Sequence, residues 1–243
     1  MALALRFDLA YKIGKIRSKG LPYLSRGVKR FFKTTNEVID LYVLDIKNGL
    51  SRLPEDVKRK KLDGLGKTFE IKVLSADDRS YLEEFVDFGK SKAVLWDEYL
   101  EIIFKQSVCF LALLDKHIVA ITCLAFGEFP FQNFDADFIL GPTQTYRCES
   151  FVDREYRQRG IMALLWDYEA SYALHKGYTH IIAAIRQDNK DSYEPTLKFG
   201  FKKYATIMFK ERFFMQRHES IKIDDRNDRI ISLRLQSGRI LTI

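Results

Sequence analysis

The sequence has few cysteines, few prolines and no long apolar run. Its 243 residues include 3 Cys and 5 Pro. The most apolar windows, 108–114 and 118–126, are much shorter than the roughly 18 residues that a membrane-spanning helix needs. The chain does not open on a short apolar block followed by small residues, so we expect no secretory signal. These absences favour a folded cytoplasmic protein, either free or bound to the surface of a membrane.

The three cysteines, Cys109, Cys123 and Cys148, all lie in apolar stretches that favour β-structure. An odd number of cysteines in such places indicates buried thiols in a reducing compartment rather than a disulfide framework. Neither these cysteines nor the 4 His have the spacing of metal ligands. We therefore predict three free thiols and no structural metal.

Positive charge is concentrated at the start of the chain. The net charge is +7, yet residues 1–36 hold nine Lys and Arg against the single acid Asp8, which leaves −1 for the remainder. Residues 1–35 would dock on an anionic membrane surface, bind an acidic macromolecule, or pack on the core with their charges in water. For the second alternative we favour an acidic acyl carrier protein and expect no nucleic-acid partner.

Periodicity and turn residues divide the chain into three regions. Residues 1–66 begin with basic helical stretches and continue into a strand at 38–46. Residues 67–208 alternate strands and helices, and residues 209–243 end in a β-hairpin around the turn 236–238. With 47% hydrophobic and 14% aromatic residues, the chain can form a sizeable core. We predict an α/β fold with a mixed sheet, helices on its faces, a basic N-terminal extension and a C-terminal hairpin.

The middle region contains an antiparallel hairpin followed by a β-α-β unit. A parallel β-α-β step places the end of its first strand beside the N-terminus of its helix, where ligands tend to bind. The predicted strands are 69–74, 108–114, 118–126, 145–152, 180–185 and 201–208. Four helices are predicted: one that ends at about 88, and others at 97–105, at 160–175 and around 192–199.

The turn between the strand ending at Val152 and the next helix has the composition of a phosphate site. A helix N-terminus exposes unpaired N–H groups, and Gly160 lets an anion approach the backbone. Arg157 and Arg159 add positive charge there; the alternative is that they are solvated turn residues. The helix that follows has apolar residues at the spacing of one face: Ile161, Leu164, Leu165 and Tyr168.

The stretch 145–204 resembles the GNAT superfamily of N-acetyltransferases. The acetyl-CoA motif of that family, Arg/Gln-x-x-Gly-x-Gly/Ala, reads here Arg157-x-x-Gly160-x-Met162. A second landmark, an Asn after the following strand and then a short helix ending in Gly-Phe, is matched by Asn189 and by Gly200–Phe201. From 69 to 126 the agreement extends only to the order of elements.

The resemblance implies a fold, a co-substrate and a set of contacts. Residues 67–208 would form a GNAT-like domain that uses acetyl-CoA or another acyl-CoA and no metal. The main chain of Phe151 and Val152 would bind the pantetheine arm as an added strand, and Asn189 would contact the pantetheine or the reacting end. The backbone amides of six consecutive residues would hold the CoA diphosphate: Arg157, Gln158, Arg159, Gly160, Ile161 and Met162.

Two positions depart from the family pattern. Met162 replaces a small residue but still offers its N–H. Many members carry a Tyr seven residues after the Asn, which protonates the departing thiolate, and here that position is Thr196. Tyr193, one helical turn earlier, would act as the general acid in its place; alternatively, Tyr193 is an ordinary surface residue.

For the general base, the first candidate is Glu149 and the second is Glu128. The alternative for Glu149 is an ion pair with Arg147, which strict alternation places on the same face of the strand. A water relay, or an amine that arrives deprotonated, would remove the need for a base.

The sequence thus predicts an N-acyltransferase that transfers an acetyl group from CoA to a primary amine in a ternary complex. The acceptor would be a small molecule or a protein, selected by 83–97 and by the loop 128–143. Two alternatives stay open. One is a non-catalytic acyl-CoA-binding module, which the missing Tyr at position 196 favours. The other is an acyltransferase that uses an acyl carrier protein or a longer acyl donor.

Overall fold

The computed structural model describes residues 35–47, 69–74, 79–91, 97–131, 136–212, 216–223, 231–235 and 240–242. The predictions for residues 1–34, including the basic segment and its partners, lie outside these ranges. The chain forms two compact units. The larger comprises residues 40–206 and 223–243, and the smaller comprises residues up to 39 and 207–222. The division of the sequence into three regions stays a prediction.

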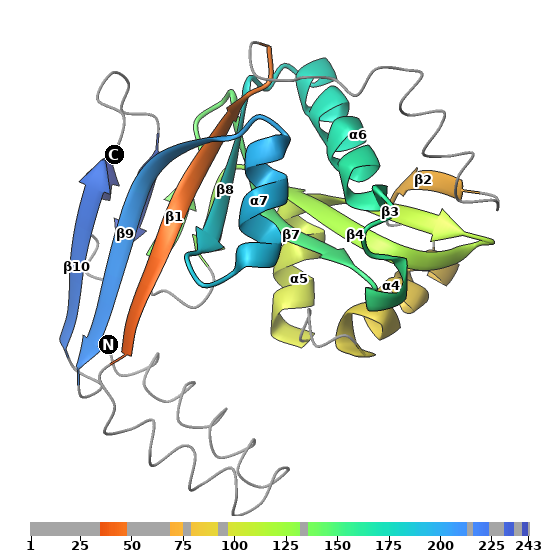
Figure 1. Ribbon diagram of the computed structural model, residues 1–243, viewed down its shortest axis with the longest axis horizontal. Coiled ribbons are helices and arrows are strands. Elements are labelled where there is room, and N and C mark those ends of the chain that lie inside the picture. Colours follow the sequence, from red (N-terminus) through yellow and green to blue (C-terminus); the bar gives the residue numbers. More distant parts are fainter. Residues whose placement is uncertain are drawn as a thin grey trace, which may run out of the picture. The chain divides into compact units, whose positions relative to one another are not determined.

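The main sheet is mixed, which confirms the predicted fold class (Figure 1). Strands β2, β3, β4 and β7 are antiparallel neighbours, whereas β7 and β8 are parallel. The eight strands follow in the order β10 (Gln216–Ile223), β9 (Lys202–Arg212), β1 (Thr35–Asp45), β8 (His180–Arg186), β7 (Gln144–Val152), β4 (His117–Ala125), β3 (Ser107–Leu114) and β2 (Phe69–Val73).

Helices cover both faces of this sheet in the larger unit. On β7, Ser150 accepts a hydrogen bond from Trp166 Nε1 of α6 (Ile161–His175) at 3.1 Å. The next residue, Phe151, packs against Phe88 of α4 (Arg79–Ser91), with ring centroids 5.9 Å apart. Because successive side chains of a strand point to opposite faces, α6 and α4 lie on opposite faces. This explains why β3 and β4 are almost continuously apolar and buried.

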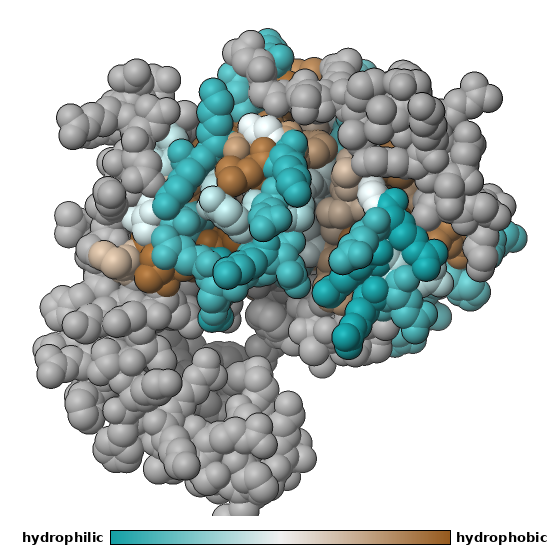
Figure 2. Space-filling model, in the orientation of Figure 1, coloured by the Kyte–Doolittle hydropathy of each residue, from teal (hydrophilic) through white to brown (hydrophobic). Residues whose placement is uncertain are grey.

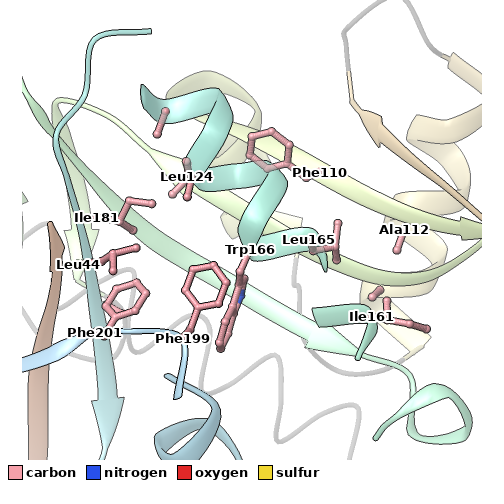
Figure 3. Packing of buried hydrophobic residues seen from close by; sticks show 14 of the residues in the cluster. Leu44, Phe110, Ala112, Leu124, Ile161, Leu165, Trp166, Ile181, Phe199 and Phe201 are labelled. Atoms are coloured by element: carbon pink, nitrogen blue, oxygen red, sulfur yellow. The ribbon is translucent and has the colours of Figure 1, made fainter. Parts of the chain in front are cut away.

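The hydrophobic core of the larger unit lies between α6 and the sheet (Figure 3). Side chains of β3, β4 and β8 meet those of α6 there. Two aromatic residues just after α7 (Lys190–Lys198) complete the cluster, namely Phe199 and Phe201. The centroid of the Trp166 ring lies 5.4 Å from that of Phe199. Helix α5 (Asp97–Gln106) packs on β3 and β4.

A second, four-stranded antiparallel sheet has the order β12-β11-β6-β5. The predicted C-terminal hairpin is confirmed as β11 (Ser232–Leu235) and β12 (Ile240–Thr242). The prediction of a loop at 128–143 is wrong in part, because β5 (Glu128–Phe131) and β6 (Ala136–Ile139) form a hairpin there and β6 pairs with β11. The alternate aromatic side chains explain the strands, since Phe129, Phe131 and Phe138 are all buried.

The cysteine prediction is wrong for two of the three residues. Cys109 of β3 and Cys123 of β4 form a disulfide, while Cys148 is a buried free thiol. The reason lies in the hairpin register, which places Cys109 directly opposite Cys123 with their Cα atoms 4.1 Å apart. Next to the turn, Leu114 pairs with His117, and counting from there would place Cys109 opposite Thr122. An irregularity between Ala112 and Leu113 shifts the register by one residue and brings Cys123 opposite Cys109 instead.

The predicted strand at 38–46 is confirmed as β1, which lies between β8 and β9. Asp40 on this strand is buried, and its Oδ1 accepts hydrogen bonds from Gln187 at 3.0 Å and Thr206 at 2.7 Å. Lys203 Nζ lies 3.0 Å from the same oxygen. The carboxylate therefore connects β1 with β9 and with the residue after β8.

Asp40→Asn should lower the free energy of unfolding in a pH-dependent way. Burial by itself would raise the pKa of Asp40, but hydrogen bonds from Gln187, Thr206 and Lys203 outweigh it and hold the pKa below its ordinary value of 3.8. A depressed folded-state pKa means that the ionised group stabilises the fold above about pH 4 and that this contribution is lost as pH falls. Urea unfolding should show that the free energies of unfolding of the wild type and of Asp40→Asn differ by about 1–3 kcal/mol at neutral pH. This difference should shrink below about pH 4. Glu155→Gln, which alters an exposed acid, is the control, and a pH-independent difference for Asp40→Asn would contradict the prediction.

Candidate functional site

The parallel strands β7 and β8 separate before either ends. Their pairing runs from Gln144↔His180 to Arg147↔Ala183. β7 continues to Val152 and stays paired with β4, where Ala120 faces Val152. The pairing with β8 does not continue beyond Arg147, and in the described part of the chain residues 150–152 have a strand neighbour on one side only. A free strand edge of this kind can accept an extended ligand as an additional strand.

A β-bulge lies at the point of separation. On β4, Cys123 pairs with Glu149 and the next residue, Leu124, pairs with Arg147, so Cys148 is an extra residue on β7. A bulge re-aims the side chains that follow it. It lies next to the last residue of β7 that pairs with β8.

The bulge places Arg147 and Glu149 on different faces of the sheet. Arg147 bonds to α6 through Glu169, and Ser150 also contacts α6. Glu149, next to Ser150, therefore faces the α4 side together with Phe151. The expectation that Arg147 and Glu149 share a face is wrong, because the extra residue shifts the alternation between them.

The turn after β7 leads into α6 with two residues in the left-handed region. A short 3₁₀ helix at Arg154–Tyr156 is followed by Gln158 with φ 62° and by Gly160 with φ 79°. The first helical bond runs from Leu164 N to Gly160 O at 3.2 Å. Within the described residues, no backbone group accepts from the N–H groups of 158–162. Such N–H groups at the positive end of a helix form a binding site for an anion.

The two predicted arginines flank this turn and are exposed. Arg157 Nε donates to Val152 O at 3.1 Å, and its guanidinium lies 5.6 Å from the centroid of the Phe151 ring. Arg159 lies 5.4 Å from the Tyr156 ring. The structure therefore brings Arg157 into contact with the free end of β7. Figure 2 shows the turn and α7 as two hydrophilic areas on one face of the larger unit.

Asn189 lies at the start of α7, on the same face of the sheet as α6 (Figure 1). Its carbonyl accepts from the N–H groups of Ser192 and Tyr193, while its side chain is exposed. Tyr193 is 41% exposed, with its ring centroid 6.1 Å from that of Tyr42. Thr196 is buried, and its hydroxyl donates to Ser192 O at 2.7 Å.

The two candidate catalytic residues thus lie on opposite faces of the sheet, Glu149 on the α4 face and Tyr193 on the face of α6 and α7, where its ring lies near Tyr42 of β1. The second candidate base is placed elsewhere. Glu128 lies at the start of β5 in the second sheet and forms an ion pair with Arg234.

Sequence reasoning missed a buried polar network under α6. Arg147 Nε donates to Glu169 Oε1 at 2.7 Å, and Thr122 Oγ1 donates to Glu169 Oε2 at 2.6 Å. The predicted face of α6 ended in Tyr168, which is 40% exposed, whereas Glu169 is fully buried. Glu169 follows Leu165 by four residues, so a charge within the apolar stripe was the signal that would have found it.

Burial and pairing act against each other in this ion pair. Burial lowers the pKa of Arg147, which the nearby Glu169 carboxylate opposes. Burial raises the pKa of Glu169, which Arg147 and the Thr122 hydroxyl oppose. Arg147 stays charged, because a guanidinium does not lose its proton in proteins, and its charge favours the ionised form of Glu169.

Across the ranges from 35 to 242 that the structure describes, no cluster of three or more His, Cys, Asp or Glu could hold a metal ion. None of the helices described there is both long and apolar enough to span a membrane.

Residues 75–201, just over half of the chain, match the model of the acetyltransferase (GNAT) family. No curated protein matches the sequence. Among solved structures, a GCN5-related glucosamine N-acetyltransferase region of a fungal multi-domain GH3 β-N-acetylglucosaminidase is 12% identical, with a TM-score of 0.50, covering 79% of this chain and 23% of that one. This similarity shows a shared fold.

Two further solved structures are similar at lower TM-scores. A functionally unknown conserved protein from Staphylococcus epidermidis ATCC 12228 is 14% identical, with a TM-score of 0.43, over 77% of this chain and 65% of that one, so the match spans slightly less than two thirds of its length. Aminoglycoside N-acetyltransferase AAC(6')-Iy in complex with CoA is 18% identical, with a TM-score of 0.43, over 55% of this chain and 91% of that one.

Proposed function

The chain belongs to the acetyltransferase (GNAT) family, and we propose that it transfers an acetyl group from coenzyme A to a primary amine. The observation that carries this proposal is the arrangement around β7. In the described part of the chain, a strand edge at 150–152 with no second strand neighbour ends beside a helix N-terminus. The N–H groups there have no backbone acceptor and are flanked by Arg157 and Arg159. One extended ligand that ends in a diphosphate would use both features.

The CoA diphosphate would bind at the start of α6. Backbone N–H groups and the helix dipole favour negative charge there, and two exposed guanidinium groups add to it. Arg157 holds the Val152 carbonyl at 3.1 Å. On binding, Arg157 would exchange this carbonyl for a phosphate oxygen and leave the carbonyl to the pantetheine arm. Of the six predicted residues, the N–H groups of five would face the phosphates: Gln158, Arg159, Gly160, Ile161 and Met162. The N–H of Arg157 donates to Arg154 O at 3.4 Å, so this residue would contribute its guanidinium.

The pantetheine arm would lie along the free edge of β7, bonded to the main chain of Phe151 and Val152 as an added strand. Asn189, exposed at the start of α7, would contact the arm from the α7 side. This placement directs the thioester toward the bulge at Cys148, where β7 and β8 begin to separate.

The chemistry needs an oriented thioester and two proton transfers. The amine nitrogen forms a bond to the carbonyl carbon from the α4 face, and Glu149 takes its proton. The C–S bond then breaks with its electron pair on sulfur. Tyr193 gives a proton to this thiolate from the α7 face. Acid and base on opposite faces keep the incoming amine apart from the departing thiol.

The proposal is tested by thiol release from acetyl-CoA with a panel of small amines and amine-bearing peptides. Turnover that depends on the amine is expected. CoA that binds while no acyl donor releases thiol would instead favour the second candidate, a non-catalytic acyl-CoA-binding module, which the buried Thr196 in place of Tyr supports. Absence of CoA binding would refute both.

Glu149→Gln should lower kcat by about 10²–10⁴-fold, the range typical of a lost general base. CoA affinity should be unchanged, because the side chain faces the α4 side and the diphosphate site is at α6. Glu155→Gln, an exposed acid in the neighbouring turn, is the matched control. An unchanged kcat for Glu149→Gln would show that Glu149 is not the general base. Water would then take the proton, or the amine would arrive neutral.

Tyr193→Phe should lower kcat by roughly 10²-fold or more while leaving the KM for the amine unchanged, since a thiolate needs its proton only in the chemical step. Tyr168→Phe, which alters an exposed tyrosine of α6, is the control. A kcat equal to that of the wild type would make Tyr193 an ordinary surface residue.

The acceptor and the role of the basic segment belong to the same proposal. We infer an amine on a small molecule or a protein as acceptor. An acyl carrier protein as donor, or an anionic membrane as docking surface, would act through residues 1–35. Deleting these residues and measuring kcat/KM with free acetyl-CoA against the acylated carrier separates the alternatives, since only the carrier reaction should be lost if the segment recruits it.

A further inference from the structure

The buried ion pair between β7 and α6 has no part in the mechanism above. Arg147 occupies the last position of β7 that pairs with β8, opposite Ala183, and its side chain is 4% exposed. Its Nε donates to Glu169, whose second oxygen accepts from Thr122. Glu169 therefore has a partner on each oxygen and holds the guanidinium in one orientation.

The two terminal nitrogens of Arg147, unlike its Nε, have no hydrogen-bond partner among the described residues. Nη1 and Nη2 are buried, and among the residues that the structure describes no atom accepts a hydrogen bond from either. The guanidinium carbon lies 4.2 Å from the centroid of the Trp166 ring and 4.7 Å from that of Phe201. Rings can lie against the plane of the group but accept no in-plane hydrogen bond. Buried donors without acceptors are rare and costly, so a ligand oxygen that reaches them would be held strongly.

The proposed function places such an oxygen at this position. A pantetheine arm that starts at the α6 turn and follows β7 from 152 to 148 covers five residues, roughly 17 Å at about 3.4 Å each. The extended arm is of comparable length. Its thioester would therefore lie beside the next residue, Arg147.

The charges of Arg147 and Glu169 determine which kind of ligand oxygen can bind to the guanidinium. Arg147 and Glu169 neutralise each other at 2.7 Å, so a second buried carboxylate would lack a counter-charge. A neutral carbonyl oxygen avoids that cost. A thioester carbonyl also gains negative charge when an amine attacks it, and a fixed donor then binds it more strongly than in the ground state.

We propose that Arg147 donates a hydrogen bond to the carbonyl oxygen of the bound acyl thioester and stabilises the negative charge that forms there, with Glu169 as its positioning residue. The inference rests on the proposed function. As the C–N bond forms, the π electron pair of the carbonyl moves to this oxygen. It returns to the carbon when the C–S bond breaks and CoA leaves as the thiolate that Tyr193 protonates.

The test compares two unreactive analogues by calorimetry. Acetyl-dethia-CoA has CH₂ in place of sulfur and keeps the carbonyl, whereas S-ethyl-CoA lacks the carbonyl. We expect the wild type to bind the first at least tenfold more tightly, as for a hydrogen bond to a charged group. Arg147→Lys should lose this preference, bind S-ethyl-CoA like the wild type, and have a kcat about 10²–10³-fold lower. Arg186→Lys is the control, because Arg186 forms an exposed ion pair with Asp188.

A purely structural role would change the melting temperature and not the preference between analogues. If Arg147→Lys does not fold, the double variant Arg147→Met with Glu169→Gln leaves no unpaired charge and carries the same test. Equal preference in wild type and variant overturns the role of Arg147 and leaves the proposed function intact. Failure of the wild type to bind either analogue overturns both.

Discussion

Reversing both charges of the turn before α6, with Arg157→Glu and Arg159→Glu together, should weaken CoA binding by about 100- to 1,000-fold. Each charge-assisted contact to a phosphate contributes about 1.5–3 kcal/mol, and about 1.4 kcal/mol corresponds to a tenfold change in affinity. The substitutions leave the backbone N–H groups in place but surround them with negative charge. Calorimetry with CoA measures the effect directly.

The matched control for this experiment lies at the other end of the same helix. Lys176→Glu reverses an exposed charge just after the last turn of α6. It should leave CoA affinity within about twofold of the wild type, because a charge at the C-terminal end of a helix does not act on its N-terminal turn, where the diphosphate would bind. Affinity of the wild type should also fall as salt is added, because exposed charges are screened. An unchanged affinity for the double variant would show that the diphosphate binds elsewhere.

Glu169→Ala should lower the free energy of unfolding by about 3–5 kcal/mol. The side chain of Glu169 is fully buried beside Arg147, and removing one partner leaves the other charge uncompensated in the core. Thr122 also loses its acceptor on Glu169 Oε2. Urea unfolding of the two proteins gives the difference.

A variant without either charge identifies the cause. Arg147→Met with Glu169→Gln should recover much of the lost stability, because an ion pair replaced by residues of similar volume leaves no isolated charge. Glu155→Ala, in the exposed turn before α6, should change stability by no more than about 0.5 kcal/mol. Equal destabilisation in the single and double variants would mean that packing, and not the charge, is what Glu169 supplies.

The bulge at Cys148 shows why the catalytic side chains were harder to predict than the diphosphate turn. Alternation alone places Arg147 and Glu149 on one face and makes them natural partners. One extra residue on β7 separates them, and Arg147 then pairs with Glu169, 22 residues further along the chain. No local pattern marks a bulge, because it is produced by the match between two strands.

The disulfide and the second sheet are intermediate cases. Cys109 and Cys123 are partners in a hairpin that the sequence itself predicts, but counting register from its turn pairs Cys109 with Thr122. Only the irregularity between Ala112 and Leu113 brings Cys123 opposite Cys109. The strands at 128–131 and 136–139 likewise have alternate buried Phe side chains. Their pairing with the C-terminal hairpin joins residues almost a hundred positions apart and had no signal in the sequence.

The sequence by itself determined the family, the mixed sheet and the turn before α6. The turn depends on interactions within a few residues: a left-handed Gly160, a helix that begins at Ile161, and N–H groups that find no backbone acceptor in the part of the chain that the structure describes. Only the tertiary structure decided which residues meet at the end of the β7–β8 pairing. Strand register, the bulge and the burial of Glu169 depend on how distant strands and helices pack, and the free energy of that packing is shared by residues that no local spacing connects.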